Sequence, residues 1–209
     1  MPIRLVISDV DSTLIEQEVI DQLADEAGQG AQVSSITARA MAGELDFKEA
    51  LIERVRLLSG LPESVFGKVA QKLSLSPGAS ELREFCKNNG ILFGAVSGGF
   101  AQVLTHLEFF RNLDYLATNN LEVKEGLITG RVMGPIVDRE GKAEHLRRFA
   151  STHDVDLSET LAIGDGANDL LMIKEARIGV AYKAKQILRE NANLVIEDDL
   201  RDVIEVLRR

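Results

Sequence analysis

The stretch IRLVISDVDST, residues 3–13, places two carboxylates one residue apart at the end of a short apolar run. The run, residues 3–8, reads as a buried strand, and Asp9 and Asp11 follow where it ends. Unpaired anions in such a place repel each other and lose solvation. A divalent cation would offset most of this cost, and carboxylate oxygens suit Mg²⁺. The alternative is a strand followed by an ordinary polar turn, because Asp and Ser are common turn residues.

A second acidic cluster, GDGAND at residues 164–169, also follows an apolar run, residues 160–163. Asp165 and Asp169 are four residues apart in a loop that enters a helix, so both can ligate a cation directly or through water. Asn168 can cap that helix or bind an oxygen. Because ligands of an open parallel sheet bind outside the carboxyl ends of its strands, we expect the two clusters to meet in one crevice.

Short apolar runs alternate with helix-like segments along most of the chain. The predicted strands are 3–8, 91–96, 115–118, 160–163, 178–181 and 194–196, and the predicted helices are 79–88, 141–151, 169–176, 185–191 and 198–207. Continuous apolar runs fit strands that are covered on both faces, so the alternation favours an open, doubly wound and mostly parallel α/β sheet. Residues 121–129 have a turn-like centre between alternating flanks and predict a β-hairpin.

Residues 16–75 break this alternation, because they look helical throughout and contain no strand candidate. The segment is longer than a simple crossover needs. We therefore predict a helical cap at 16–75, inserted into an α/β catalytic core formed by residues 1–15 and 76–209.

Two charged residues of the predicted cap each have two interpretations. Arg54 lies in the middle of an apolar stripe formed by Phe47, Leu51 and Leu58. Its guanidinium either snorkels to water from the edge of the stripe or points toward the sheet as an anion-binding group. Glu18 lies opposite the apolar side of its helix, so it is either a solvated acid or one that faces a cleft.

The bulk composition argues against several classes of protein. A formal charge of −9, a pI of about 4.9 and an aromatic content of 5% argue against nucleic-acid binding. The single cysteine, Cys86, reads as a core thiol and leaves no intrachain disulfide or thiolate metal site. The chain shows neither a leader-like N-terminus nor an apolar run long enough for a membrane span. We expect a cytoplasmic protein with no nucleic-acid or membrane partner, and the oligomeric state stays unknown.

Two weaker signals complete the pattern. Ser97 offers a hydroxyl, and Gly98 and Gly99 can bring backbone N–H groups close to an anion, although such a triplet alone usually marks a turn. Lys142 opens a helix, where the dipole favours anions, although on its own it reads as a surface lysine. All four signals together, in this order, are more specific than any one of them.

Together these motifs resemble those of the haloacid dehalogenase superfamily and, within it, the phosphoserine phosphatase family. The resemblance spans residues 3–196 and rests on DVDST at 9–13 leading to Glu18, VSGGF at 96–100, Lys142, GDGANDL at 164–170, and the cap positions Met41, Phe47, Arg54, 57–58 and 61–62. Two stretches depart from the family pattern: Gln186 stands where proline is common, and DREG at 138–141, before Lys142, is unusual.

The resemblance implies Mg²⁺-dependent hydrolysis of O-phosphoserine to serine and phosphate, the last step of serine biosynthesis, through an aspartyl-phosphate on Asp9. Asp11 would protonate the leaving oxygen and then activate water. The ion would lie between the Asp9 carboxylate, the Asp11 carbonyl and Asp165, with Asp169 in support. The phosphoryl oxygens would be held by Ser97, Gly98, Lys142 and Asn168. From the cap, the substrate ammonium would meet Glu18, its carboxylate would pair with Arg54, and Met41 and Phe47 would line the pocket.

Two other functions stay open from the sequence. A related capped phosphatase or phosphotransferase, acting on phosphohomoserine or another small phosphate monoester, would share every catalytic motif and differ only at Glu18 and Arg54. A signalling receiver domain also uses strand-end aspartates, Mg²⁺, a hydroxyl and a lysine on a parallel sheet. The long helical insertion and the pair Asp165 and Asp169 argue against the receiver domain.

Overall fold

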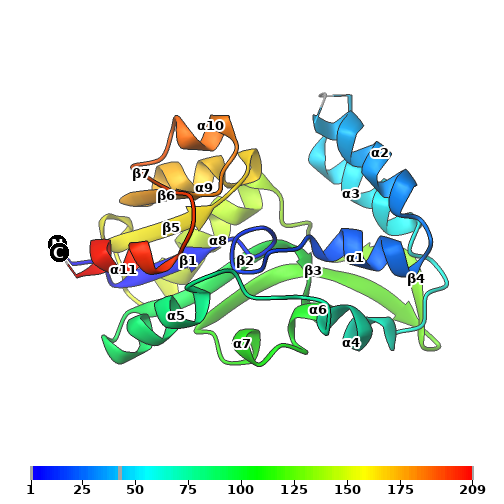
Figure 1. Ribbon diagram of the computed structural model, residues 1–209, viewed down its shortest axis with the longest axis horizontal. Helices are drawn as coiled ribbons and strands as arrows, with labels where there is room; N and C mark the ends of the chain where they lie inside the picture. The colour runs from blue at the N-terminus through cyan, green and yellow to red at the C-terminus, as the bar shows by residue number, and fades with distance from the viewer. Residues whose placement is uncertain (1, 42–43, 209) are drawn as a thin grey trace.

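The computed structural model describes residues 2–41 and 44–208, and its centre is a seven-stranded sheet in the order β4-β3-β2-β1-β5-β6-β7 (Figure 1). The strands are β1 (Leu5–Ser8), β2 (Leu92–Phe100), β3 (Tyr115–Lys124), β4 (Leu127–Met133), β5 (Thr160–Gly164), β6 (Ile178–Tyr182) and β7 (Leu194–Ile196). All neighbouring pairs are parallel except β3 and β4, which are antiparallel. The predicted mostly parallel α/β sheet is confirmed.

Helices cover both faces of the sheet, so the side chains of β1 alternate between two apolar clusters. Val6 packs in one cluster with Leu82 of α5 (Ala79–Asn88) and Val203 of α11 (Arg201–Leu207). Leu5 and Ile7 pack in the other, which contains Leu146 and Phe149 of α8 (Arg139–Thr152) and Met172 of α9 (Leu170–Glu175). The short helices α6 (Ala101–Leu104), α7 (Glu108–Arg111) and α10 (Gln186–Arg189) complete the core. This burial on both faces explains the continuous apolar run that ends at Asp9.

Two strands are longer than the sequence predicts by more than one residue. β2 continues through Ser97 to Phe100, because it stays paired with β3 beyond the apolar run, with an irregularity in the register between Ser97 and Phe100. β3 runs without a break from the sheet into the outer hairpin, so the predicted hairpin at 121–129 is the far end of the β3–β4 pair. Strand pairing therefore overrides the weak strand propensity of the glycines in β2.

The insertion between β1 and α5 consists of four described helices. They are α1 (Val19–Glu26), α2 (Gly30–Met41), α3 (Phe47–Arg56) and α4 (Val65–Ala70). Figure 1 shows α2 and α3 side by side, standing away from the sheet. The chain leaves and returns at one place, because Ile15 and Leu75 form an antiparallel bridge and the Ser76 N–H donates to the Leu14 carbonyl at 2.9 Å.

The tip of the β3–β4 hairpin holds the connection between α3 and α4. The Gly60 N–H donates to the Ile128 carbonyl and the Ile128 N–H donates to the Leu61 carbonyl, each at 2.8 Å. The antiparallel strand pair thus fixes the end of α3 relative to the sheet. Within residues 2–41 and 44–208, none of the helices combines the length and the apolar character that crossing a bilayer requires.

Candidate active site

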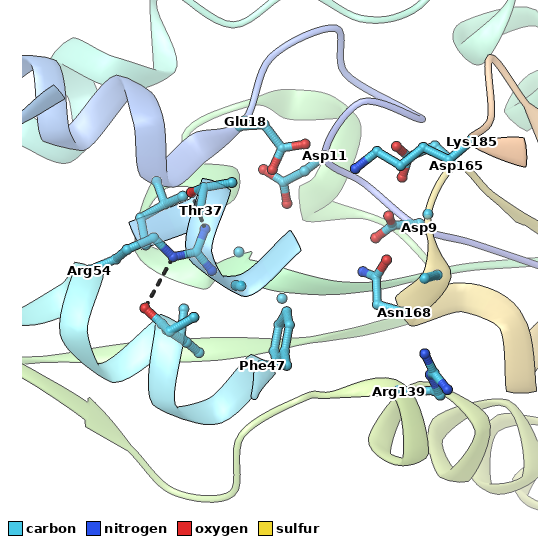
Figure 2. Close-up of a pocket in the computed structure, with 18 of the residues that line it drawn as sticks. Asp9, Asp11, Glu18, Thr37, Phe47, Arg54, Arg139, Asp165, Asn168 and Lys185 are labelled. Carbon is cyan, nitrogen blue, oxygen red and sulfur yellow. Dashed lines mark hydrogen bonds between the residues drawn. The ribbon is translucent and has the colours of Figure 1, made fainter. Parts of the chain in front are cut away.

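The loops that follow β1, β2 and β5 meet at the carboxyl end of the sheet and face the helices α1, α2 and α3 across one pocket of about 490 Å³ (Figure 2). Of the residues that the sequence singles out, the pocket is lined by Asp9, Asp11, Glu18, Phe47, Arg54, Gly98, Asp165 and Asn168. Ser97, Lys142 and Asp169 are buried and bond to residues of its floor. Met41 ends α2, but its side chain lies outside the described part of the chain.

Three carboxylates gather on the floor of the pocket. Asp9, Asp165 and Asp169 each offer an oxygen, and these oxygens lie within 4.8 Å of one another. Burial raises the pKa of Asp9 well above its ordinary value, and the charge of Asp169 adds to the effect. Burial and Asp169 also raise the pKa of Asp165 to about 7. Such a crowded, desolvated set of hard oxygens fits a divalent metal ion, which would remove the repulsion that raises these pKa values.

Lys142 ties this cluster together from α8. Its Nζ lies 2.7 Å from Asp9 Oδ1 and 2.6 Å from Asp169 Oδ1, and its side chain is only 1% exposed. Burial alone would lower the pKa of Lys142, but Asp169 and Asp9 raise it above its ordinary value, so the buried amine is charged. The reading of Lys142 as a surface lysine is therefore wrong.

The start of α8 places Lys142 at this point. The Asp138 side chain accepts a hydrogen bond from the Gly141 N–H at 2.8 Å and caps the helix. The Lys142 N–H donates to the Asp138 carbonyl at 2.8 Å, within the first turn. The unusual DREG stretch thus supplies a regular N-cap for the helix that carries the lysine.

Asp11 is held by groups from two other elements. Ser97 Oγ donates to Asp11 Oδ2 at 2.6 Å, and the Val19 N–H at the start of α1 donates to Asp11 Oδ1 at 2.7 Å. The Gly99 N–H in turn donates to Ser97 Oγ at 2.7 Å. Burial and the charge of Glu18 raise the pKa of Asp11 to about 6, against the lowering effect of the Ser97 hydrogen bond. An acid with a pKa near neutrality can both give and take a proton at physiological pH.

The glycines of β2 allow side chains to approach the backbone closely. A Cβ at Gly99 would lie 2.7 Å from Asp11 Oδ2, and one at Gly98 would lie 3.1 Å from the Phe47 ring. Phe47 of α3 therefore rests against the Gly98 backbone at the pocket wall. A side chain at either position would push Asp11 or Phe47 out of place.

Arg54 projects into the pocket from α3. Asp46 caps the start of the helix in a capping box, in which the Glu49 N–H donates to Asp46 Oδ1 at 2.8 Å. The Arg54 Nε donates to the Ala50 carbonyl at 3.2 Å, and its Nη1 lies 3.5 Å from the Thr37 hydroxyl. Among the described residues Arg54 forms no ion pair. Its guanidinium thus lines the pocket instead of pairing at the surface.

Glu18 lies on the same side of the pocket as Asp11. It precedes α1 and accepts a hydrogen bond from Ser12 Oγ at 2.7 Å. Figure 2 shows Arg54 and Phe47 on the side of α3, facing Asp9, Asp165 and Asn168 on the side of the sheet. The pocket thus presents a guanidinium and the Glu18 carboxylate together with the acidic cluster that Lys142 contacts. Glu18 lines this cleft and is also exposed to solvent, so both interpretations of it hold together.

Sequence reasoning missed three polar residues of the pocket wall. Thr37 of α2 lies beside Arg54, Arg139 lies at the start of α8, and Lys185 follows β6. The sequence did carry a signal for two of them. Arg139 belongs to the unusual DREG stretch, and Lys185 follows a strand whose carboxyl end points at the same crevice.

Comparison with known proteins agrees with this geometry. The sequence model of the haloacid dehalogenase-like hydrolases matches residues 6–174. The chain belongs to this family. A phosphoserine phosphatase of Streptococcus thermophilus is 48% identical over 97% of this chain and 95% of the relative. One of Streptomyces coelicolor is 50% identical over 96% of this chain, which spans only 49% of that relative.

Solved structures agree over nearly the whole chain. A phosphoserine phosphatase captured as a phospho-aspartyl intermediate analogue superimposes with a TM-score of 0.90 at 38% identity, covering 99% of both chains. A substrate-bound phosphoserine phosphatase complex superimposes with a TM-score of 0.91 at the same identity and coverage. Membership of this hydrolase family replaces the receiver-domain alternative.

Proposed function

We propose that this chain is a phosphoserine phosphatase, which hydrolyses O-phosphoserine to serine and inorganic phosphate in the last step of serine biosynthesis. The observation that carries the proposal is that Arg54 and Glu18 both line the pocket whose floor holds Asp9. A zwitterionic amino acid offers a carboxylate for the one and an ammonium for the other. Its phosphate would then lie toward Asp9.

The first half of the reaction transfers the phosphoryl group to the protein. An Asp9 carboxylate oxygen attacks phosphorus, and the bond between phosphorus and the serine oxygen breaks. Asp11, whose pKa of about 6 lets it carry a proton, gives that proton to the departing oxygen. Lys142, charged and buried beside Asp9, offsets the repulsion between the carboxylate and the phosphate dianion.

The second half returns Asp9 to its starting state. Asp11, now ionised, takes a proton from a water molecule, whose oxygen attacks phosphorus and displaces the Asp9 carboxylate. Ser97, Gly98 and Asn168 are proposed to orient the phosphoryl oxygens, since Gly98 and Asn168 line the pocket and Ser97 holds Asp11. Phe47 would cover the substrate from the side of α3 and help to exclude bulk water.

We propose Mg²⁺ as the metal, held by Asp9, the Asp11 carbonyl and Asp165, with Asp169 in support. When bound, the ion supplies positive charge that the attack of one anion on another requires. Asp169 suits a supporting role, because its Oδ2 accepts hydrogen bonds from the Asp165 and Gly166 N–H groups, each at 3.1 Å, while Oδ1 pairs with Lys142.

Residues 16–75 are proposed to act as a cap over a catalytic core of 1–15 and 76–209. The bridge between Ile15 and Leu75 at the junction supports this division. Met41 is proposed to line the capped pocket with Phe47. We further propose that the protein works in the cytoplasm.

The proposal is tested most simply by phosphate release with Mg²⁺ from phosphoserine, phosphothreonine, phosphohomoserine and sugar phosphates. We expect phosphoserine to have a higher kcat/KM than the sugar phosphates, because only an amino acid satisfies both Arg54 and Glu18. A sugar phosphate with a higher kcat/KM would replace the proposed substrate and leave the catalytic floor in place.

Replacing Arg54 by Ala should lower kcat/KM for phosphoserine by about 10- to 100-fold, the range expected for a hydrogen bond to a charged group. A small aryl phosphate lacks the amino-acid carboxylate, so its hydrolysis should change little. Arg56→Ala serves as the control, because Arg56 is exposed on the same helix. Equal losses on both substrates would remove Arg54 from substrate recognition.

Chelation of divalent metal should abolish phosphate release, and added Mg²⁺ should restore it. In a thermal melt, Mg²⁺ should also stabilise the wild-type protein, by about 2.7 kcal/mol at 100 times its Kd. Asp165→Asn should lose most of this stabilisation while it keeps the fold. Full activity in excess chelator would contradict a metal at this cluster.

A further inference from the structure

The pocket holds two carboxylates, Asp11 and Glu18, besides those of the proposed metal site. A divalent ion and Lys142 together balance Asp9, Asp165 and Asp169, and Arg54 balances one of Asp11 and Glu18, so one carboxylate stays uncompensated by these groups. The chain as a whole has a formal charge of −9. A phosphate monoester carries a charge of about −2 near neutral pH, so these carboxylates and the net charge of the chain repel it as it approaches.

Two exposed cations at the pocket wall oppose this repulsion. Lys185 and Arg139 both line the pocket, and within residues 2–41 and 44–208 neither forms an ion pair. Most other charged groups of the pocket have a partner: Asp9 forms an ion pair with Lys142, Asp11 accepts a hydrogen bond from Ser97, and Glu18 accepts one from Ser12. Unpaired, hydrated cations at a pocket entrance are suited to meeting an incoming anion.

Lys185 is anchored at this place by its backbone. Its N–H donates to the Asp165 carbonyl at 2.9 Å, and its neighbours Ala184 and Leu188 are buried. Figure 2 shows its side chain extending past Asp165 into the pocket. Its amine therefore lies over the acidic floor while the residue stays exposed to solvent.

Arg139 lies on the other side of the floor. In Figure 2 its guanidinium is separated from Lys185 by Asp9 and Asn168. It occupies the first turn of α8, three residues before Lys142. The two side chains thus stand on opposite sides of the place where the phosphoryl group must arrive.

We propose that Lys185 and Arg139 form a cationic rim that captures the phosphate dianion before it reaches Asp9. The proposal rests on the proposed function only in that the pocket takes a phosphate monoester, whatever the rest of the substrate is. Because the rim acts on the phosphate, it should raise kcat/KM for every such substrate by the same factor. Arg54, in contrast, acts on the amino-acid carboxylate alone.

The test compares Lys185→Gln, Arg139→Gln and the double variant with wild type, in saturating Mg²⁺ and over a range of KCl concentrations. At low ionic strength the double variant should lose about tenfold in kcat/KM, with kcat nearly unchanged. The ratio of variant to wild type should approach one as KCl rises, because salt screens exposed charges. Phosphoserine and a small aryl phosphate should give the same ratio.

Matched variants separate charge from structure. Lys185→Arg and Arg139→Lys keep the charge and should retain most of kcat/KM. Lys87→Gln on α5 and Arg148→Gln near the end of α8 remove exposed charges away from the pocket and should behave as wild type. Calorimetric titration of the Mg²⁺-loaded protein with inorganic phosphate should show weaker binding to the double variant, by about the same factor as kcat/KM.

Three results would overturn the rim. The first is a double variant with the kcat/KM and the salt dependence of wild type. The second is a loss of kcat/KM that stays the same at high KCl. The third is a Lys185→Arg variant whose kcat/KM is as low as that of Lys185→Gln. Failure of the proposed substrate is distinguishable, because it would appear as no preference for phosphoserine in wild type. In that case the measurements with the aryl phosphate and with inorganic phosphate would still test whether Lys185 and Arg139 bind the phosphate.

Discussion

Asp9→Asn should abolish turnover, with a loss in kcat on the order of 10⁴-fold or more, because an amide cannot form the covalent phosphate ester. The protein should stay folded. The substitution removes one of three crowded carboxylates, while Lys142 keeps its pairing with Asp169 at 2.6 Å. Phosphate release and urea unfolding measure the two effects separately.

The stability of Asp9→Asn should equal or exceed that of wild type in the presence of chelator. Burial and neighbouring acids raise the pKa of Asp9, so its ionised form opposes folding near neutral pH. Asp202→Asn, at an exposed position of α11, is the matched control for both measurements. A folded Asp9→Asn protein with substantial turnover would remove Asp9 as the nucleophile.

Lys142→Met should cause the second large effect, because it leaves Asp9 and Asp169 buried without their shared cation. In chelator near neutral pH the free energy of unfolding should fall by about 3–5 kcal/mol, the range for breaking a buried ion pair. Turnover with Mg²⁺ should fall by about 10²- to 10³-fold, as for the loss of a group that stabilises developing charge. Urea unfolding and phosphate release are the measurements.

The stability penalty of Lys142→Met should shrink as the pH falls. Without the lysine, the pKa of Asp9 in the folded state rises further above its value in the unfolded chain. Such an acid destabilises the fold at alkaline pH, and the penalty is lost once it is protonated in both states. Lys174→Met, at an exposed position of α9, is the control. Unchanged stability across the pH range would show that Lys142 does not hold the carboxylates together.

The parts of the site that follow strand ends were predictable from local sequence. Asp9 and Asp165 each come directly after an apolar run, and parallel strands bring such ends to one edge of the sheet. The helical insertion that carries Arg54 was predictable because a stretch without strand signals interrupts a strand–helix alternation. In both cases the information lies in short-range periodicity and in where it stops.

The parts that depend on long-range pairing were not predictable from local sequence. A lysine at a helix start looks the same in sequence whether it is solvated or buried, and Lys142 is buried only because Asp9 and Asp169 meet it there. β2 continues through its glycines only because β3 pairs with it. Lys185 and Arg139 were missed because the sequence does not show which acids surround an exposed cation in the pocket.

The measurement that tests the central claim most directly is capture of the phosphorylated protein. The Mg²⁺-loaded protein is mixed with phosphoserine, quenched in acid within its first turnovers and reduced with borohydride, which converts an acyl phosphate of aspartate to homoserine. Peptide mass spectrometry should then find homoserine at position 9 in wild type and nowhere in Asp9→Asn. Homoserine at Asp11 or Asp165, or none at any position while phosphate is released, would contradict nucleophilic attack by Asp9.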